Sequence, residues 1–202
     1  MMSPPERSPE RDAAIDALLQ TVPFAGWTIP ALREAAGPDA DLLFLGGAAD
    51  MIEAYCDLAD RRMEDGAAAL NLQAQRLPAR VRAVIALRLA QNRLEKEAIR
   101  RALGILFLPD NSGLAARCTA RTVDAIWHAA GDRSADFSWY TKRAILAGVY
   151  ASTLLFWLRD DSEGDQASLQ FLDRRLAGVG RIGRIRKRGE ALLQRFRPSH
   201  AA

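Results

Sequence analysis

The chain has 202 residues, of which 49% are hydrophobic and 26% charged, and its formal net charge is +3. These values exclude a disordered or fibrous chain and are those of a folded protein with a sizeable core. The two cysteines, Cys56 and Cys118, have no second thiol or histidine at metal-ligand spacing, so neither a disulfide framework nor a zinc site is indicated.

The pattern of the first 72 residues predicts a series of short helices followed by a long one. A first helix is predicted from Glu10 to about Val22, with Ser8 as its N-cap. Thr28 is the expected N-cap of a short second helix, and residues 39–47 form a third brief helical segment. A long helix is predicted from about Ala48 through Leu72. This order resembles the N-terminal part of TetR-type regulators, in which the third helix reads DNA.

The charges of this region are unsuited to binding DNA. Seven acidic residues and no Arg or Lys lie between Glu34 and Asp60. Phosphate contacts supply most of the affinity for duplex DNA, and this surface would repel phosphates. We therefore expect no nucleic-acid partner. Residues 42–45 (LLFL) are expected to pack onto the core, with an exposed binding patch as the alternative.

The next two elements are predicted as helices with basic outer faces. Pro78 begins a helix that reaches about Leu108, with a possible break near Gly104, and a further helix covers Leu114 to Ala130. Outward positions of the first of these helices are expected for Arg80, Arg82, Arg88, Arg93, Lys96, Arg100 and Arg101. We interpret them as a solvated face, with a phosphate-binding strip as the alternative.

An unusually apolar stretch spans residues 136–161. No charged residue lies between Arg143 and Arg159, and large apolar side chains fall on every face of the predicted helix. Such a helix is expected to be surrounded by others. The uncharged run is shorter than the roughly 20 residues that cross a bilayer, which favours a buried central helix. One face could still line a lipid pocket or a subunit interface. A last regular helix is predicted over residues 168–179.

Catalytic residues are scarce. The only histidines are His128 and His200, and His128 is expected to form a hydrogen-bonded pair with Asp124, four residues earlier. Phosphate-loop, nucleophile-elbow and Glu-x-x-His motifs are absent from the sequence. We therefore predict a protein that is not an enzyme and that binds neither metal nor cofactor.

The C-terminal segment, residues 181–202, has the pattern of a cationic interfacial helix. The positions predicted to associate with a membrane are the apolar Ile182, Ile185, Leu192, Leu193 and Phe196 and the basic Arg184, Arg186, Lys187 and Arg188. Seven basic residues and one Glu lie between Arg181 and Arg197, so the rest of the chain is net acidic. The alternatives are a helix that packs on its own domain and a disordered basic tail.

Three motifs carry a resemblance to a known family. The run AGDRSADFSWYTKRA over residues 130–144, the preceding Trp127-His128 and FLDRR over residues 171–175 resemble the Coq-nine family of ubiquinone-biosynthesis accessory proteins. The resemblance implies a homodimer with a TetR-like all-α fold, a pocket for an isoprenoid or quinone lipid, a membrane-binding tail, and the demethoxyubiquinone hydroxylase as partner.

The resemblance also assigns residues. The partner-facing surface would include Trp139 and Tyr140, with Trp127 and His128 beside them. A lipid pocket lined by the central helix would include Val149, Tyr150, Leu154, Trp157, Leu106 and Phe107.

The sequence thus predicts an all-α, TetR-like bundle of about nine or ten helices with a C-terminal amphipathic helix. Its parts would be an N-terminal part (residues 1–75), a lipid-binding and dimerisation part (76–180) and a membrane-associating tail (181–202). The predicted function is that of a lipid-binding accessory protein that presents a prenylated quinone precursor to the hydroxylase. The alternatives are a TetR-family transcriptional regulator with a lipophilic ligand and a purely structural scaffold. No targeting segment is visible, so we expect a cytoplasmic protein that is peripheral on the inner membrane, on the matrix side if the source is eukaryotic.

Overall fold

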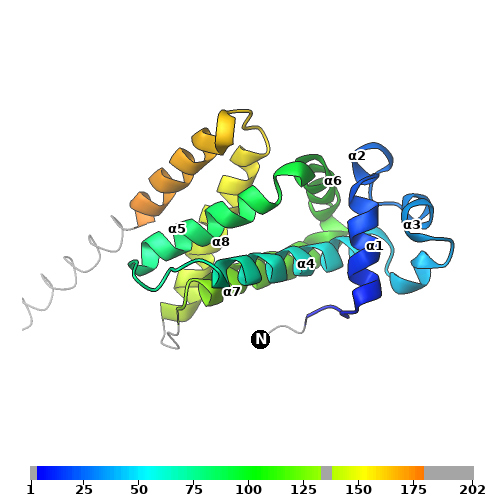
Figure 1. Cartoon of the computed structure of the whole chain (residues 1–202), viewed down its shortest axis with the longest axis horizontal. Helices are drawn as coiled ribbons and strands as arrows, with labels where there is room; N and C mark the ends of the chain where they lie inside the picture. Colours follow the sequence, from blue (N-terminus) through cyan, green and yellow to red (C-terminus); the bar gives the residue numbers. More distant parts are fainter. Residues whose placement is uncertain (1–3, 133–137, 180–202) are drawn as a thin grey trace, which may run out of the picture.

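The computed structural model describes residues 4–132 and 138–179, which form α-helices and 3-10 turns without a strand (Figure 1). A further α-helix, residues 166–179, follows the labelled elements. The labelled elements are α1 (Pro9–Leu19), α2 (Val22–Ala25), α3 (Ile29–Ala36), η1 (Ala40–Leu43), α4 (Ala48–Ala68), α5 (Leu77–Gln91), η2 (Arg93–Glu95), α6 (Lys96–Leu106), η3 (Pro109–Asn111), α7 (Ser112–Ala129), α8 (Ser138–Trp157) and η4 (Glu163–Asp165).

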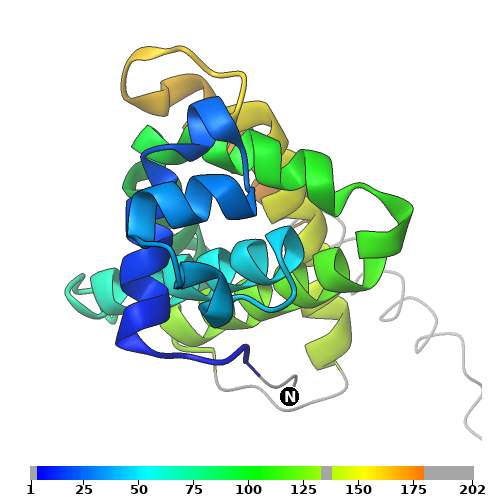
Figure 2. The ribbon, with the colours of Figure 1, turned by 90° about the vertical axis from the view of Figure 1, so that its right-hand side faces the viewer.

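The N-terminal helices α1, α2 and α3 gather around the start of α4 (Figures 1 and 2). The predicted caps are confirmed: the Ser8 hydroxyl accepts from the Arg11 amide at 3.2 Å, and the Thr28 hydroxyl accepts from the Ala31 amide at 3.3 Å. Helix α1 ends at Leu19, before the predicted end, because Pro23 has no amide proton with which to continue the helix.

The third helical segment is a single 3-10 turn, η1, which is shorter than the predicted residues 39–47. Gly47, with φ of +63°, ends the segment and allows α4 to begin in a new direction. Phe44 is buried, as predicted, but Leu42 and Leu45 are 68% and 87% exposed, so the prediction that the whole segment packs onto the core is wrong. The position of a DNA-reading helix is therefore occupied by a short acidic turn with two exposed leucines.

The predicted helix from Pro78 to Leu108 is two helices. Its break falls at Asn92, between α5 and α6, and Gly104 lies inside α6. Asn92 follows the last helical residue of α5 with φ −93° and ψ 13°. Asparagine disfavours helix interiors because its side chain competes for backbone hydrogen bonds. The break turns α6 toward α2, where the Trp27 indole donates to the Ala98 carbonyl at 3.0 Å.

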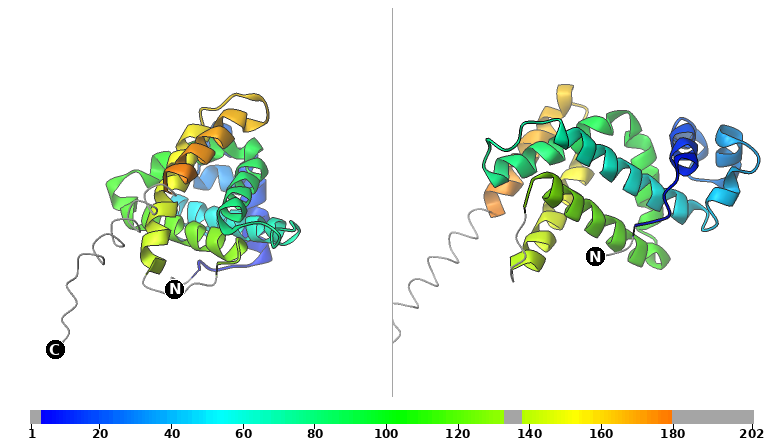
Figure 3. Two further views of the ribbon diagram at one scale, coloured as in Figure 1. Left: turned by 90° about the vertical axis from the view of Figure 1, so that its left-hand side faces the viewer. Right: turned by 60° about the horizontal axis from the view of Figure 1, so that its bottom comes forward.

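Helices α4, α5, α7 and α8 enclose the core, and α4 packs most extensively against α7 (Figure 3). Contacts between α4 and α7 proceed in the same order along both helices, so the two run in the same direction. Examples along the interface are Glu53–Arg121 at 2.8 Å, Asp60–Thr122 at 3.0 Å and Glu64–His128 at 2.9 Å. Gly131, with φ of +73°, follows α7 and ends it, as predicted.

The central helix α8 has one buried face and one exposed face. Leu146, Val149 and Trp157 are buried, whereas Leu155 and Phe156 are 46% and 37% exposed. The prediction that α8 is surrounded on every face is therefore wrong for the second face. Among the described helices, none combines the length and the hydropathy that a membrane span needs. The predicted tail, residues 181–202, lies outside the described residues.

Candidate functional site

A groove of about 790 Å³ lies between α6, the exposed face of α8 and the helix over residues 166–179. This volume is within the range of small-molecule sites in proteins. Its apolar lining comprises Leu103, Phe107, Leu155, Phe156, Leu158 and Phe171. The same groove is lined by Arg100, Gly104, Ser152, Arg159, Asp160 and Asp161. The groove is therefore an apolar surface with charged groups on its border.

The apolar surface continues from α8 onto the helix over residues 166–179. The rings of Phe156 and Phe171 stack, with centroids 4.6 Å apart and planes 11° from parallel. Across the groove, Phe107 follows the end of α6 and is 68% exposed. An exposed apolar surface shared by three helices is unusual in a monomer and is typical of a ligand or protein contact.

The charged border is fixed by hydrogen bonds of the chain itself. The Arg100 guanidinium donates to the Leu158 carbonyl at 2.6 Å, which ties α6 to the end of α8. Asp160 accepts from the amides of Ser162 and Ser168 at 2.9 and 2.7 Å, and from the Ser168 hydroxyl. Burial acts to raise the pKa of Asp160, but these hydrogen bonds outweigh it and hold the pKa well below the ordinary value. Asp160 is thus an ionised cap for the last described helix.

The predicted lipid-contacting residues lie mostly elsewhere. Phe107 lines the groove, but Leu106, Val149, Tyr150 and Trp157 are core residues, and Leu154 is half-buried; none of these five lines it. The physical reason is helical phase: positions 149, 150 and 157 of α8 face the bundle, whereas positions 152, 155 and 156 face the groove. The core position of Trp157 is reinforced by the Lys96 ammonium, 4.7 Å from its ring centroid.

The predicted partner-facing residues flank the connection between α7 and α8. Tyr140, in the first turn of α8, is 77% exposed. His128 is exposed near the end of α7, and Trp127 beside it is half-buried. The side chain of Trp139 lies outside the described residues.

The predicted pairing of His128 with Asp124 is wrong. His128 Nδ1 lies 2.9 Å from a Glu64 carboxylate oxygen, and Asp124 accepts a hydrogen bond from Arg143 of α8. Each of these contacts links two different helices, so residue spacing along a single helix could not predict it.

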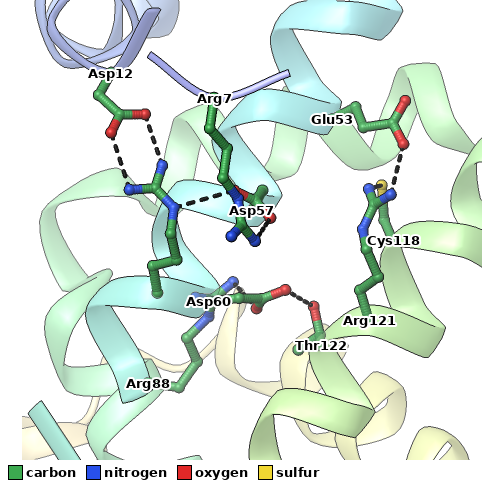
Figure 4. Close-up of polar contacts among 10 residues, drawn as sticks. Arg7, Asp12, Glu53, Asp57, Asp60, Arg88, Cys118, Arg121 and Thr122 are labelled. Carbon is green, nitrogen blue, oxygen red and sulfur yellow. Dashed lines mark hydrogen bonds and ion pairs between the residues drawn. The ribbon is translucent and has the colours of Figure 1, made fainter. Parts of the chain in front are cut away.

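A buried ion pair joins α4 to α5 inside the bundle (Figure 4). Arg88 Nη2 lies 3.0 Å from Asp60 Oδ1, and the Thr122 hydroxyl of α7 donates to Asp60 Oδ2 at 3.0 Å. The predicted outward position of Arg88 is therefore wrong. The spacing of the residues indicates the inward position, because Arg88 lies one helical turn after the inward-facing Val84 and Ile85.

Burial and charge oppose each other in this ion pair. Burial raises the pKa of Asp60 to about 6, although Arg88 and the Thr122 hydroxyl act to lower it. Burial acts to lower the pKa of Arg88, but the Asp60 carboxylate outweighs it, and the net shift is upward. In the part of the chain that the structure describes, no group of three His, Cys, Asp or Glu residues could hold a metal ion.

Comparison with known proteins gives both a family and a fold. The family model of COQ9 matches residues 113–183. "Ubiquinone biosynthesis protein COQ9-B, mitochondrial" of Xenopus laevis is 32% identical over 196 residues, which are 89% of this chain and 67% of that protein. "Ubiquinone biosynthesis protein COQ9, mitochondrial" of Rattus norvegicus is 42% identical over 98 residues, which are 46% of this chain and 31% of the rat protein. The aligned part of the chain also spans 62% of COQ9-A of Xenopus laevis, so it covers less than two thirds of the rat protein and of COQ9-A.

Among solved structures, a TetR transcriptional regulator from Nitrosomonas europaea superposes with a TM-score of 0.69. The match covers 86% of this chain and 99% of the regulator at 23% identity, and it shows that the fold is TetR-like. The family is shown by the COQ9-B alignment, which extends along most of the chain, and by the family model, which covers α7 and α8. The chain therefore belongs to the COQ9 family.

Proposed function

We propose that this protein acts in ubiquinone biosynthesis without catalysing a reaction, by holding a prenylated quinone intermediate in the groove and offering it to the demethoxyubiquinone hydroxylase. The role in ubiquinone biosynthesis is supported by the names of its relatives. The observation that carries lipid binding is the groove, in which three helices expose large apolar side chains toward one another.

The physical need for such a carrier is clear. A prenyl chain cannot cross water to an enzyme without an apolar path, because each square ångström of exposed apolar surface costs about 25 cal/mol. Leu155, Phe156 and Phe107 would cover part of the prenyl chain and lose their own contact with water. Of the residues predicted to line a pocket, Phe107 keeps that role in the proposal, and the five others support the helices from the core.

The charged border of the groove gives the ligand an orientation. Arg159 and Asp161 lie at this border, just after the end of α8. A quinone head group carries oxygens that accept hydrogen bonds, whereas a prenyl chain has no hydrogen-bonding group. The head group would therefore lie at the charged border and the prenyl chain along the phenylalanines.

Binding can be measured by titrating the full-length protein with a short-chain ubiquinone analogue and following quenching of tryptophan fluorescence. We expect saturable quenching, weakened at least tenfold by Phe156→Asp, because a carboxylate would have to be desolvated beneath the ligand. Leu94→Asp is the matched control, since Leu94 is 96% exposed and does not line the groove. Equal affinity of the two variants would remove the groove from the proposal.

Membrane association and dimerisation remain proposals of their own. The basic, apolar tail over residues 181–202 would attach the protein to an anionic leaflet, peripheral on the inner membrane. The relatives are named mitochondrial proteins, which supports a site in mitochondria or in the corresponding bacterial compartment.

Deleting residues 181–202 should reduce flotation of the protein with anionic liposomes. Equal flotation of the full-length and truncated proteins would show that the tail does not attach the protein to the membrane. Light scattering after size exclusion would distinguish a homodimer from a monomer.

A transcriptional regulator is the second candidate, because the fold is that of a TetR regulator. The charges favour the first proposal. Asp39 and Glu34 are exposed around η1, and the Arg33 guanidinium is already paired with Asp41 at 2.6 Å. The Arg11 guanidinium, which donates to the Leu43 carbonyl, is buried. We expect no shift of genomic DNA fragments at low salt, where phosphate contacts are strongest.

A further inference from the structure

The two cysteines of the chain belong to the best-packed pair of helices. Cys56 lies one turn before Asp60 on α4, and Cys118 lies one turn before Thr122 on α7. The two helices run in the same direction, and the Asp60–Thr122 hydrogen bond of 3.0 Å fixes their register at that turn. One turn earlier this register places Cys56 of α4 opposite Cys118 of α7, close enough for each thiol to shift the pKa of the other.

A cation is held beside one of the two sulfurs (Figure 4). Arg121 Nη2 lies 3.6 Å from Cys118 Sγ, and Arg121 Nη1 lies 2.8 Å from the Glu53 carboxylate, which fixes the guanidinium in place. Arg121 and the pair of thiols therefore form one connected cluster between α4 and α7.

The environment divides the two thiols into different roles. The neighbouring Cys56 thiol and the positive charge of Arg121 lower the pKa of Cys118, against the effect of burial. The neighbouring Cys118, together with burial, raises the pKa of Cys56 well above its ordinary value. A thiolate that attacks an oxidant and a neighbouring thiol that resolves the product are the two parts of a redox-sensitive cysteine pair.

We propose that Cys56 and Cys118 are a modification site, a thiol pair that a hydroperoxide oxidises to an intramolecular disulfide joining α4 to α7. In the first step the Cys118 thiolate attacks hydrogen peroxide. The O–O bond breaks, Cys118 becomes a sulfenic acid, and the leaving hydroxide takes up a proton to form water. In the second step Cys56 sulfur attacks the sulfenic sulfur, the S–O bond breaks, and the hydroxyl leaves as water with the Cys56 proton. Two thiols are oxidised, and one peroxide is reduced to two waters.

The site is independent of the lipid proposal, because the groove is lined by α6, α8 and the helix over residues 166–179. In the structure both cysteines are free thiols. A disulfide would be the first covalent link between α4 and α7, and thiol reductants would reverse it.

The test is non-reducing peptide mapping of the full-length, reduced protein after treatment with a small excess of hydrogen peroxide. We expect a linked pair of peptides containing Cys56 and Cys118, two hydrogen atoms lighter than their sum, that disappears with dithiothreitol. Thiols that both remain alkylatable, or sulfinic acid without a linked pair, would overturn the proposal.

Variants separate the two roles. In Cys56→Ser we expect loss of the linked pair and trapping of a sulfenic acid on Cys118 by dimedone, whereas Cys118→Ser should give neither product. Helical circular dichroism on each variant shows whether it is folded. Arg121→Gln should slow formation of the linked pair in an otherwise unchanged protein.

The matched control for Arg121 is Arg117→Gln. Arg117 also lies on α7 and pairs with Glu53, at 3.6 Å, but it has no contact with Cys118. Equal rates for the two arginine variants would contradict the assigned activation of Cys118.

Discussion

Arg88 enters the core because α5 presents one face to α4 and α7, and position 88 lies on that face. Its partner Asp60 comes from another helix, 28 positions earlier in the chain. Replacing both by apolar residues of similar volume is often neutral or stabilising, whereas removing one partner leaves a buried charge and costs about 3–5 kcal/mol. The pair thus joins α4 to α5 and is expected to contribute little net stability.

Stability should depend on pH through Asp60. Its pKa in the folded protein is about 6, above the ordinary value, so the folded state binds the proton more tightly than the unfolded state does. Between pH 4 and 6 unfolding releases that proton, and raising the pH therefore lowers the free energy of unfolding, by about 3 kcal/mol in total. Above pH 6 this contribution is constant.

Urea unfolding at several pH values checks the assignment. The double variant Asp60→Leu/Arg88→Met lacks the group, and all other titrating residues are shared. Between pH 4 and pH 6, the free energy of unfolding of the unmodified protein should fall relative to that of the double variant. If the free energies of unfolding of the two proteins change with pH in the same way, the pKa of Asp60 is not raised.

Asp160 makes the opposite pH prediction. Its hydrogen bonds from Ser162 and Ser168 should stabilise the start of the helix over residues 166–179 by about 1–2 kcal/mol. Because its pKa is lowered, this contribution is present above about pH 4 and is lost as the pH falls toward the native pKa. Amide hydrogen exchange of residues 166–179 should accelerate in Asp160→Ala at neutral pH. Asp161→Ala, which changes an exposed neighbour, should exchange like the unmodified protein.

At the scale of elements, the sequence allowed most of the helices to be predicted but not the groove. Helices α4, α5 and α7 have apolar residues at helical spacing, and the N-caps Ser8 and Thr28 have local signatures. The two faces of α8 are both apolar, and a side chain that packs in a core has the same composition as one that lines a groove. What distinguishes Leu155 from Val149 is the position of α6 and of the last described helix, which depends on contacts between distant parts of the chain.

The same limit applied to η1 and to the α5–α6 break. The pattern of residues 39–47 predicts a helical segment, but only the 3-10 turn η1 forms there. The break at Asn92 places α6 on α2 and so creates one wall of the groove. The sequence places the break near Gly104, 12 positions after Asn92, and so does not predict this wall of the groove.

The described residues on either side of the α7–α8 connection, Tyr140 among them, belong to the surface proposed to meet the hydroxylase. Tyr140→Asp should weaken pull-down of the demethoxyubiquinone hydroxylase by at least tenfold, because an exposed aromatic at the centre of an interface contributes about 2 kcal/mol or more. Leu45→Asp changes an equally exposed apolar residue at the other end of the molecule, beside η1, and should leave the pull-down unchanged. If both variants bind as the unmodified protein does, Tyr140 is not part of the interface.

At the scale of the whole molecule, a TetR-like bundle has an acidic turn at the position of the DNA-reading helix and an apolar groove between α6, α8 and the last described helix. The basic residues concentrate in the tail, so a membrane is a better electrostatic partner for the tail than for the N-terminal helices. Groove, tail and the α7–α8 surface would together pass a lipid from a membrane to an enzyme.

The central claim is that the groove holds a prenylated quinone intermediate. Its most direct test is mass spectrometry of an organic extract of the full-length protein, purified without detergent from cells that make ubiquinone, beside the Phe156→Asp variant. The account predicts a prenylated quinone intermediate in near-stoichiometric amount with the unmodified protein and its loss from the variant. An extract without such a lipid, or equal amounts from both proteins, would contradict the account.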